Sequence, residues 1–148
     1  MYSNEAIVSN LKNKLKYSLK FSEILDSQFD ALKSGDSRKL VNCINLMDEC
    51  HARLKDIDRI LKKNGFKGFS MEKVGENTSL LEDEDILGLF LKTREVVMDS
   101  IEKLDRNRNV VESIQGELRE EMKELTKSTQ LKNYFESAEA GNFLNFSG

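Results

Sequence analysis

The chain has 148 residues, a net charge of −3, no proline and no tryptophan, and 33% of its residues are charged. This balance lacks the broad basic surface of nucleic-acid-binding proteins, and no segment approaches the roughly 20 apolar residues that cross a bilayer. The first ten residues also lack the layout of a signal peptide. We therefore expect a cytosolic protein with no stable membrane insertion.

Two helices joined by a short turn are predicted first. The helix expected over residues 4–34 has an apolar seam in steps of three and four residues, with Ser18 and Ser22 in two of its slots. Gly35 and Asp36 then supply a helix stop and a new N-cap. A turn this short predicts that the second helix, over residues 37–63, folds back antiparallel. The seam expected on this second helix comprises Leu40, Ile44, Met47, His51, Leu54 and Leu61.

Residues 64–79 lose the helical period and contain glycines typical of a loop. Phe66, Phe69 and Met71 are too apolar for a free linker, so we expect them to fold back onto the hairpin. Residues 70–74 could form one helical turn.

A long third helix is predicted over residues 80–126, beginning at a capping box formed by Ser79 and Glu82. Apolar residues recur at every seventh position: Phe90, Val97, Leu104, Val111, Leu118 and Leu125. The companion seam line is less regular: Leu87, Arg94, Ile101, Arg108, Gln115 and Met122. Residues 127–148 are expected to form a short helix, ending at residues 140–142, and a flexible tail.

These elements predict an all-α fold over residues 1–126, an antiparallel helical hairpin plus one long helix in an elongated three-helix coiled-coil-like bundle. At 1.5 Å per residue the third helix is about 25 Å longer than either hairpin helix. Its first half, through about Leu104, would close the bundle. The apolar stripe beyond it lacks a partner within the chain, which favours a binding surface, although self-association and an unforeseen core stay open. This stripe comprises Val111, Ile114, Leu118, Met122 and Leu125.

No catalytic motif, phosphate-binding loop or metal-ligand spacing is found, so we expect no enzyme activity, no cofactor and no metal. Cys43 and Cys50 lie roughly 10 Å apart along one helix, too far for a disulfide, and are expected to be buried thiols. His51 is compared with the reactive histidine of helical phosphotransfer domains, but the lysine of their motif is displaced and its glycine is missing. We therefore expect His51 to be packed on the seam or at its edge.

Two segments resemble the FlgN-type flagellar type III export chaperones, whose close architectural cousins are the FliT-type chaperones. FDALKSGD at residues 29–36 resembles the end of the first helix in that family. LDRNRNVV at residues 104–111 is similar to the centre of its last long helix. The resemblance covers about residues 11–125, while the apolar tail residues Phe143, Leu144 and Phe146 depart from the polar ending usual in the family.

The resemblance implies a cytosolic chaperone that binds the helical C-terminal segments of hook–filament junction proteins. It would prevent their premature assembly and deliver them to the export gate. By position, the client surface would be the stripe from Val111 to Leu125, and Leu131, Tyr134 and Phe135 would contact the export gate. The alternative is a structural coiled-coil adaptor or dimerisation module without an export role. A filament-cap client and either a monomer or a homodimer also stay open.

Overall fold

The computed structural model describes residues 4–68 and 79–147, and side chains as far as residue 138. These residues form three helices and no strand: α1 (Asn4–Ser34), α2 (Ser37–Lys63) and α4 (Glu84–Ser147). The all-α prediction and the bounds of both hairpin helices are confirmed. The chain divides into two units, Met1–Val110 and Val111–Gly148, which are described separately below.

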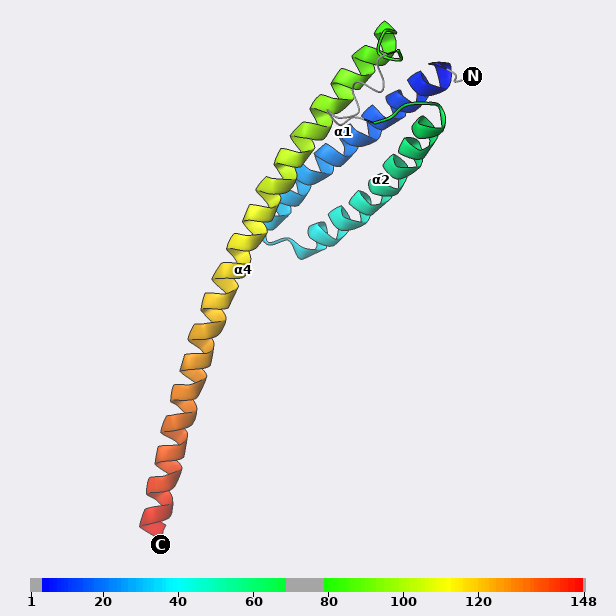
Figure 1. The fold of residues 1–148 in the computed structure, drawn as a ribbon. Helices are drawn as coiled ribbons and strands as arrows, with labels where there is room; N and C mark the ends of the chain where they lie inside the picture. Colours follow the sequence, from blue (N-terminus) through cyan, green and yellow to red (C-terminus); the bar gives the residue numbers. More distant parts are fainter. Residues whose placement is uncertain (1–3, 69–78, 148) are drawn as a thin grey trace. The chain divides into compact units, whose positions relative to one another are not determined.

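The turn between α1 and α2 forms as its residues predict. Gly35 has a φ of 70°, a left-handed conformation that glycine adopts without steric cost. The Asp36 backbone N–H donates to the Ala31 carbonyl oxygen at 3.0 Å, and the Asp36 carboxylate accepts from the Lys39 backbone N–H at 3.0 Å. These bonds satisfy groups left open at both helix ends, and α2 returns along α1 as an antiparallel hairpin (Figure 1).

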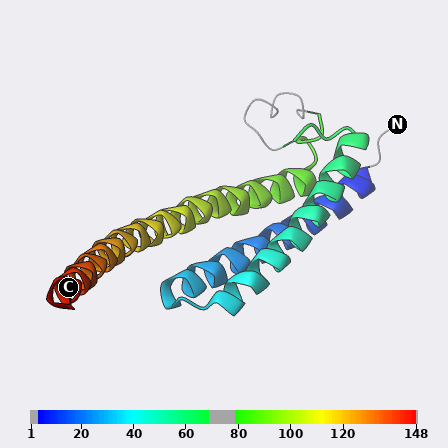
Figure 2. The ribbon, with the colours of Figure 1, turned by 90° about the horizontal axis from the view of Figure 1, so that it is seen from below.

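Figure 2 shows the same hairpin from below, with α1 and α2 side by side along their lengths. On α2 the buried heptad line consists of Cys43, Cys50 and Ile57. One line of the predicted seam lies one residue away, so its assignment of Ile44 and His51 is wrong: both are exposed. On the other predicted line Leu61 is buried, as expected, and Leu40, Met47 and Leu54 are half-buried. The cysteines act here as small apolar residues, and Cys43 and Cys50 form a buried cluster with Ile24.

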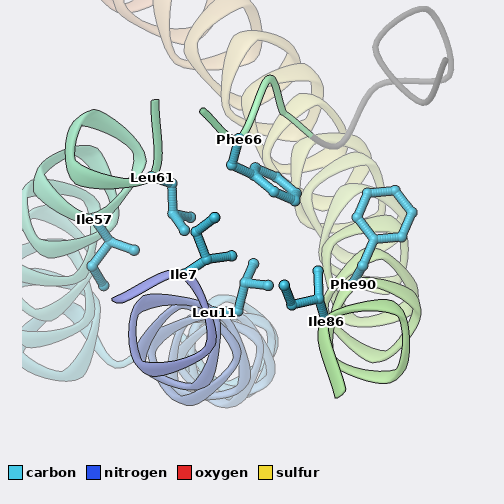
Figure 3. Close-up of a cluster of buried hydrophobic side chains, with 7 residues drawn as sticks. All are labelled: Ile7, Leu11, Ile57, Leu61, Phe66, Ile86 and Phe90. Atoms are coloured by element: carbon cyan, nitrogen blue, oxygen red, sulfur yellow. The ribbon is translucent and has the colours of Figure 1, made fainter. Parts of the chain in front are cut away.

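A second buried cluster joins four parts of the chain within the first unit (Figure 3). It contains two residues of α1, two of α2, the loop residue Phe66, and two of α4: Ile7, Leu11, Ile57, Leu61, Phe66, Ile86 and Phe90. The Phe66 and Phe90 rings lie 6.1 Å apart at an interplanar angle of 57°. The prediction that Phe66 folds back is confirmed, while Phe69, Met71 and the possible helical turn at 70–74 lie outside the described residues.

The start of α4 differs from the predicted capping box. Residues 79–83 form turns, and the helix begins at Glu84 with Asp83 before it. One Asp83 carboxylate oxygen accepts from the backbone N–H groups of Asp85 at 2.9 Å and Ile86 at 3.3 Å. An acidic side chain at this position also interacts favourably with the helix dipole. Asp83, rather than Ser79, therefore caps the helix.

The predicted end of the long helix at residue 126 is also wrong. α4 continues without a break to Ser147, so residues 127–148 do not begin a separate short helix, and the break expected at residues 140–142 is absent. The segment contains no proline. A single glycine such as Gly141 costs only about 1 kcal/mol relative to alanine, which does not force a helix to end.

Candidate functional site

A buried asparagine sets the contact between α1 and α4. Asn107 is only 4% exposed, and its Nδ2 donates to the Leu25 carbonyl oxygen and to Gln28 Oε1, both at 2.9 Å. Its Oδ1 accepts from Arg106 Nε at 3.1 Å. A buried polar side chain whose bonds are all made favours one register between two helices, because any slip would leave it unpaired.

Charged side chains extend this contact. Lys103 Nζ donates to Asp26 Oδ2 at 2.7 Å and to Ser22 Oγ at 2.8 Å, and lies 3.3 Å from Asp99 Oδ2. The hydrogen bond from Lys103, helped by one from Arg106, lowers the pKa of the Asp26 carboxyl. The same bond to Asp26 raises the pKa of Lys103, with Asp99 adding to the effect. We call these residues, together with Asn107, the polar cluster.

The buried line of α4 in the first unit is not the predicted companion line. Burial falls one residue earlier, at Ile86, Thr93, Ser100 and Asn107. The predicted line of Leu87, Arg94, Ile101 and Arg108 is exposed except for the half-buried Arg94. Hydrophobicity alone selected the wrong line because three of the buried residues are polar. The available signal was the pair Ser18 and Ser22, which the predicted α1 seam contains and the structure buries.

The predicted client residues share one face of the second unit. Val111, Ile114, Leu118, Met122 and Leu125 follow one another in steps of three and four residues, and we call them the C-terminal stripe. Val111 and Ile114 are half-buried, whereas Leu118, Met122 and Leu125 are 51%, 65% and 66% exposed. In its described part this unit is a single helix. It therefore contains no second element against which these side chains could be buried.

The two edges of the C-terminal stripe carry different charges. Glu117, Glu121 and Glu124 follow one edge at helical spacing and are exposed; we call them the acidic edge. Three residues without negative charge follow the other edge: Gln115, Arg119 and Thr126. Like charges at this spacing destabilise a helix by about 0.2–0.5 kcal/mol per pair.

The predicted export-gate residues form a separate patch on the same helix. Leu131, Tyr134 and Phe135 are 58%, 68% and 62% exposed. The Tyr134 and Phe135 rings pack edge to face, with centroids 5.7 Å apart and planes at 74°. At about 100° per residue, the centre of this aromatic patch lies about 150° around the helix axis from the C-terminal stripe. The structure thus keeps the two predicted sets on different faces.

The two cysteines and the single histidine of the chain all lie on α2. Cys43 and Cys50 are free and buried, as predicted, and burial raises the pKa of the Cys50 thiol, which disfavours the reactive thiolate. His51 is exposed on α2. Among residues 4–68 and 79–138, no group of histidine, cysteine and acidic side chains could hold a metal ion.

Within the part of the chain that the structure describes, no helix is both long enough and apolar enough to cross a membrane. Comparison of the chain with protein-family models, with curated proteins and with solved structures finds no match. The exposed C-terminal stripe is therefore the feature on which a functional proposal rests.

Proposed function

We propose that this protein is a cytosolic flagellar export chaperone that binds the helical C-terminal segments of hook–filament junction proteins. The observation that carries the proposal is the exposure of Leu118, Met122 and Leu125 along one face of a single helix. Contiguous exposed apolar surface of this kind is typical of sites that bind another protein. The flagellar client is suggested by the resemblance of residues 29–36 and 104–111 to the FlgN-type chaperones.

The mechanism is coupled folding and binding. A client end that is disordered when free becomes an amphipathic helix and lays its apolar face against the C-terminal stripe. Ordering the client opposes binding, so the affinity is moderate and the client can be released without ATP hydrolysis by the chaperone. The covered client cannot self-assemble before export.

We propose that the aromatic patch of Leu131, Tyr134 and Phe135 contacts the export gate. Aromatic side chains supply large apolar area at low entropic cost and are enriched at protein interfaces. Because this patch and the C-terminal stripe occupy different faces of α4, a client helix on one leaves the other accessible. The chaperone can then present a bound client to the gate.

Isothermal titration tests the client proposal. The protein is titrated with the C-terminal segment of each junction protein, and of the filament cap protein, from its own organism. We expect one-to-one binding of a junction segment at micromolar or tighter affinity. Leu118→Asp abolishes it with far-UV helicity retained, whereas Ser113→Asp, which adds the same charge to an exposed position on the back of the helix, does not.

Three results would contradict the proposal. Binding of the cap segment alone would assign a different flagellar client. No heat with any segment, from a folded and helical sample, would leave no support for an export role. In light scattering, the wild type could reach the mass of a dimer as its concentration is raised, while Leu118→Asp keeps the mass of a monomer. That result would favour the coiled-coil adaptor that dimerises through the same stripe.

A further inference from the structure

We infer that the helix bound by the C-terminal stripe carries lysine or arginine beside its own apolar face, where it meets the acidic edge of Glu117, Glu121 and Glu124. This inference rests on the proposed function in one respect, that the stripe binds a helix. It adds the charge pattern of that helix, which the proposed function does not specify.

The first argument is the position of the acidic edge. At 3.6 residues per turn, the three glutamates lie about 60° (Glu121), 100° (Glu117) and 120° (Glu124) from the centre of the C-terminal stripe. Side chains at such angles border the contact between two packed helices, as the e and g positions do in coiled coils. All three glutamates are exposed, so they are available to a partner.

The second argument is that the negative charges of the acidic edge form no ion pair within the described part of the chain. Lys123 lies behind the stripe and pairs there with Glu120, at 3.4 Å between Nζ and Oε1. In the described residues, no ion pair involves Glu117, Glu121 or Glu124. Three mutually repelling carboxylates therefore border the exposed apolar face. A cationic partner edge would relieve this repulsion, whereas an acidic one would increase it.

The alternative occupant is a second copy of this chain. Packing two copies through the same stripe brings the acidic edge of each against either the acidic edge or the opposite edge of the other. Only Arg119 on the opposite edge is basic, so it offers one cation against three carboxylates. Charge complementarity therefore favours a different, basic-edged chain over self-association.

Two synthetic helical peptides of identical composition test the inference with the full-length protein. Both have the same leucine stripe. One has lysines beside the stripe and glutamates on its back, and the other has these positions exchanged. Because the net charges are equal, a difference in affinity reports the placement of charge. We expect the lysine-edged peptide to bind about tenfold more tightly, with a preference that weakens as salt is raised.

Matched variants locate the effect. Glu117→Lys combined with Glu121→Lys removes or reverses the preference. Glu112→Lys combined with Glu120→Lys changes the net charge by the same amount at positions outside the acidic edge and retains the preference. Far-UV circular dichroism and thermal unfolding verify that both proteins are folded.

Equal binding of the two peptides to the wild-type protein would overturn the inference, as would an equal loss of preference in both double variants. Failure of both peptides to bind a folded protein would also overturn it. These outcomes are distinct from failure of the proposed function, because the synthetic peptides contain no flagellar sequence. A preference for the lysine-edged peptide without binding of any flagellar segment would uphold the charge pattern and contradict the export role.

Discussion

The two parts of α4 have the same helical period, but the first buries several polar residues and the second leaves apolar residues exposed. Between Glu84 and Val110, in the first unit, the buried positions include Thr93, Ser100 and Asn107. Beyond Val111, in the second unit, positions on the heptad line carry leucine and methionine that stay exposed. The apolar character of a helix position therefore does not by itself predict that the position is buried within the chain.

The reason lies in what each part contacts. In the first unit, α1 supplies Asn107 with hydrogen-bond partners such as the Leu25 carbonyl oxygen, which offset the cost of burying its amide. Among the described residues, the buried hydroxyls of Thr93 and Ser100 have no hydrogen-bond partner. In the second unit, exposed leucines contribute little to folding, since each buried leucine stabilises by about 1.5–3 kcal/mol only when it leaves water. The stability of the chain is accordingly concentrated in the first unit, and a partner is needed to use the apolar residues of the second.

The largest expected effect comes from the apolar cluster of the first unit. Phe90→Ala removes a buried ring that packs against Phe66, and lowers the free energy of unfolding by about 3–5 kcal/mol. Leu125→Ala, on the exposed C-terminal stripe, changes it by less than about 0.5 kcal/mol. Urea unfolding followed by circular dichroism measures both. Similar losses of unfolding free energy in the two variants would contradict the claim that stability is concentrated in the first unit.

Asn107→Ala tests the buried polar line. It removes the hydrogen bonds to Leu25 and Gln28, and we expect a loss of about 1–3 kcal/mol in the free energy of unfolding. Asn109→Ala, at an exposed position of the same helix, is the matched control because both changes gain the same helix propensity. If the two variants unfold at the same urea concentration, Asn107 does not stabilise the contact between α1 and α4.

Asp26→Asn tests the polar cluster through the pH dependence of the free energy of unfolding. Because the folded-state pKa of Asp26 is lowered by Lys103 and Arg106, its stabilisation is present above the unfolded-state value of about 3.9. It is lost as pH falls through the lower folded-state pKa. The carboxylate is half exposed, so we expect the variant to lose no more than about 1 kcal/mol at pH 7.

Wild type and Asp26→Asn should therefore converge in stability at the acid end of a pH series of urea unfolding curves. The exposed Asp30 provides the control, since Asp30→Asn should follow the wild-type curve. A difference between wild type and Asp26→Asn that grows as pH falls would reverse the assigned sign.

The smallest expected effects come from replacing one glycine in each unit with alanine. Gly88 and Gly116 both lie in α4, and a Cβ added at either would meet no atom within 4 Å. Gly88→Ala should raise the free energy of unfolding by about 0.5–1 kcal/mol, because Gly88 belongs to the cooperative first unit. Gly116→Ala should raise far-UV helicity without moving the urea midpoint. The same midpoint shift in both variants would mean that α4 unfolds as one cooperative element.

The hairpin could be predicted from the sequence because its signals are local. Gly35 and Asp36 fix the turn, and the bounds of α1 and α2 follow from it. The buried line of α4 could not be predicted, since hydrophobicity favoured Leu87 and Ile101 over the buried polar positions Thr93, Ser100 and Asn107. The burial of Asn107 depends on tertiary hydrogen bonds to α1, which a periodicity argument does not contain.

The candidate site could be predicted in part, because the spacing of its residues is also a local signal. The spacing of Leu118, Met122 and Leu125 placed them on one face, and the structure leaves them exposed. The separation of the aromatic patch from that face was not predicted, because a break in the helix was expected near residue 126. The unbroken helix fixes the angle between the two surfaces.

Hydrogen–deuterium exchange along α4, with and without a bound helical segment, tests the difference between its two parts most directly. In the free protein, amides of residues 84–107 should exchange slowly and those of residues 114–135 quickly, as a helix without packing partners opens readily. A saturating partner should slow exchange over residues 111–125 and leave residues 84–107 unchanged. Equally slow exchange in both parts of the free protein, or no change on saturation, would contradict the account.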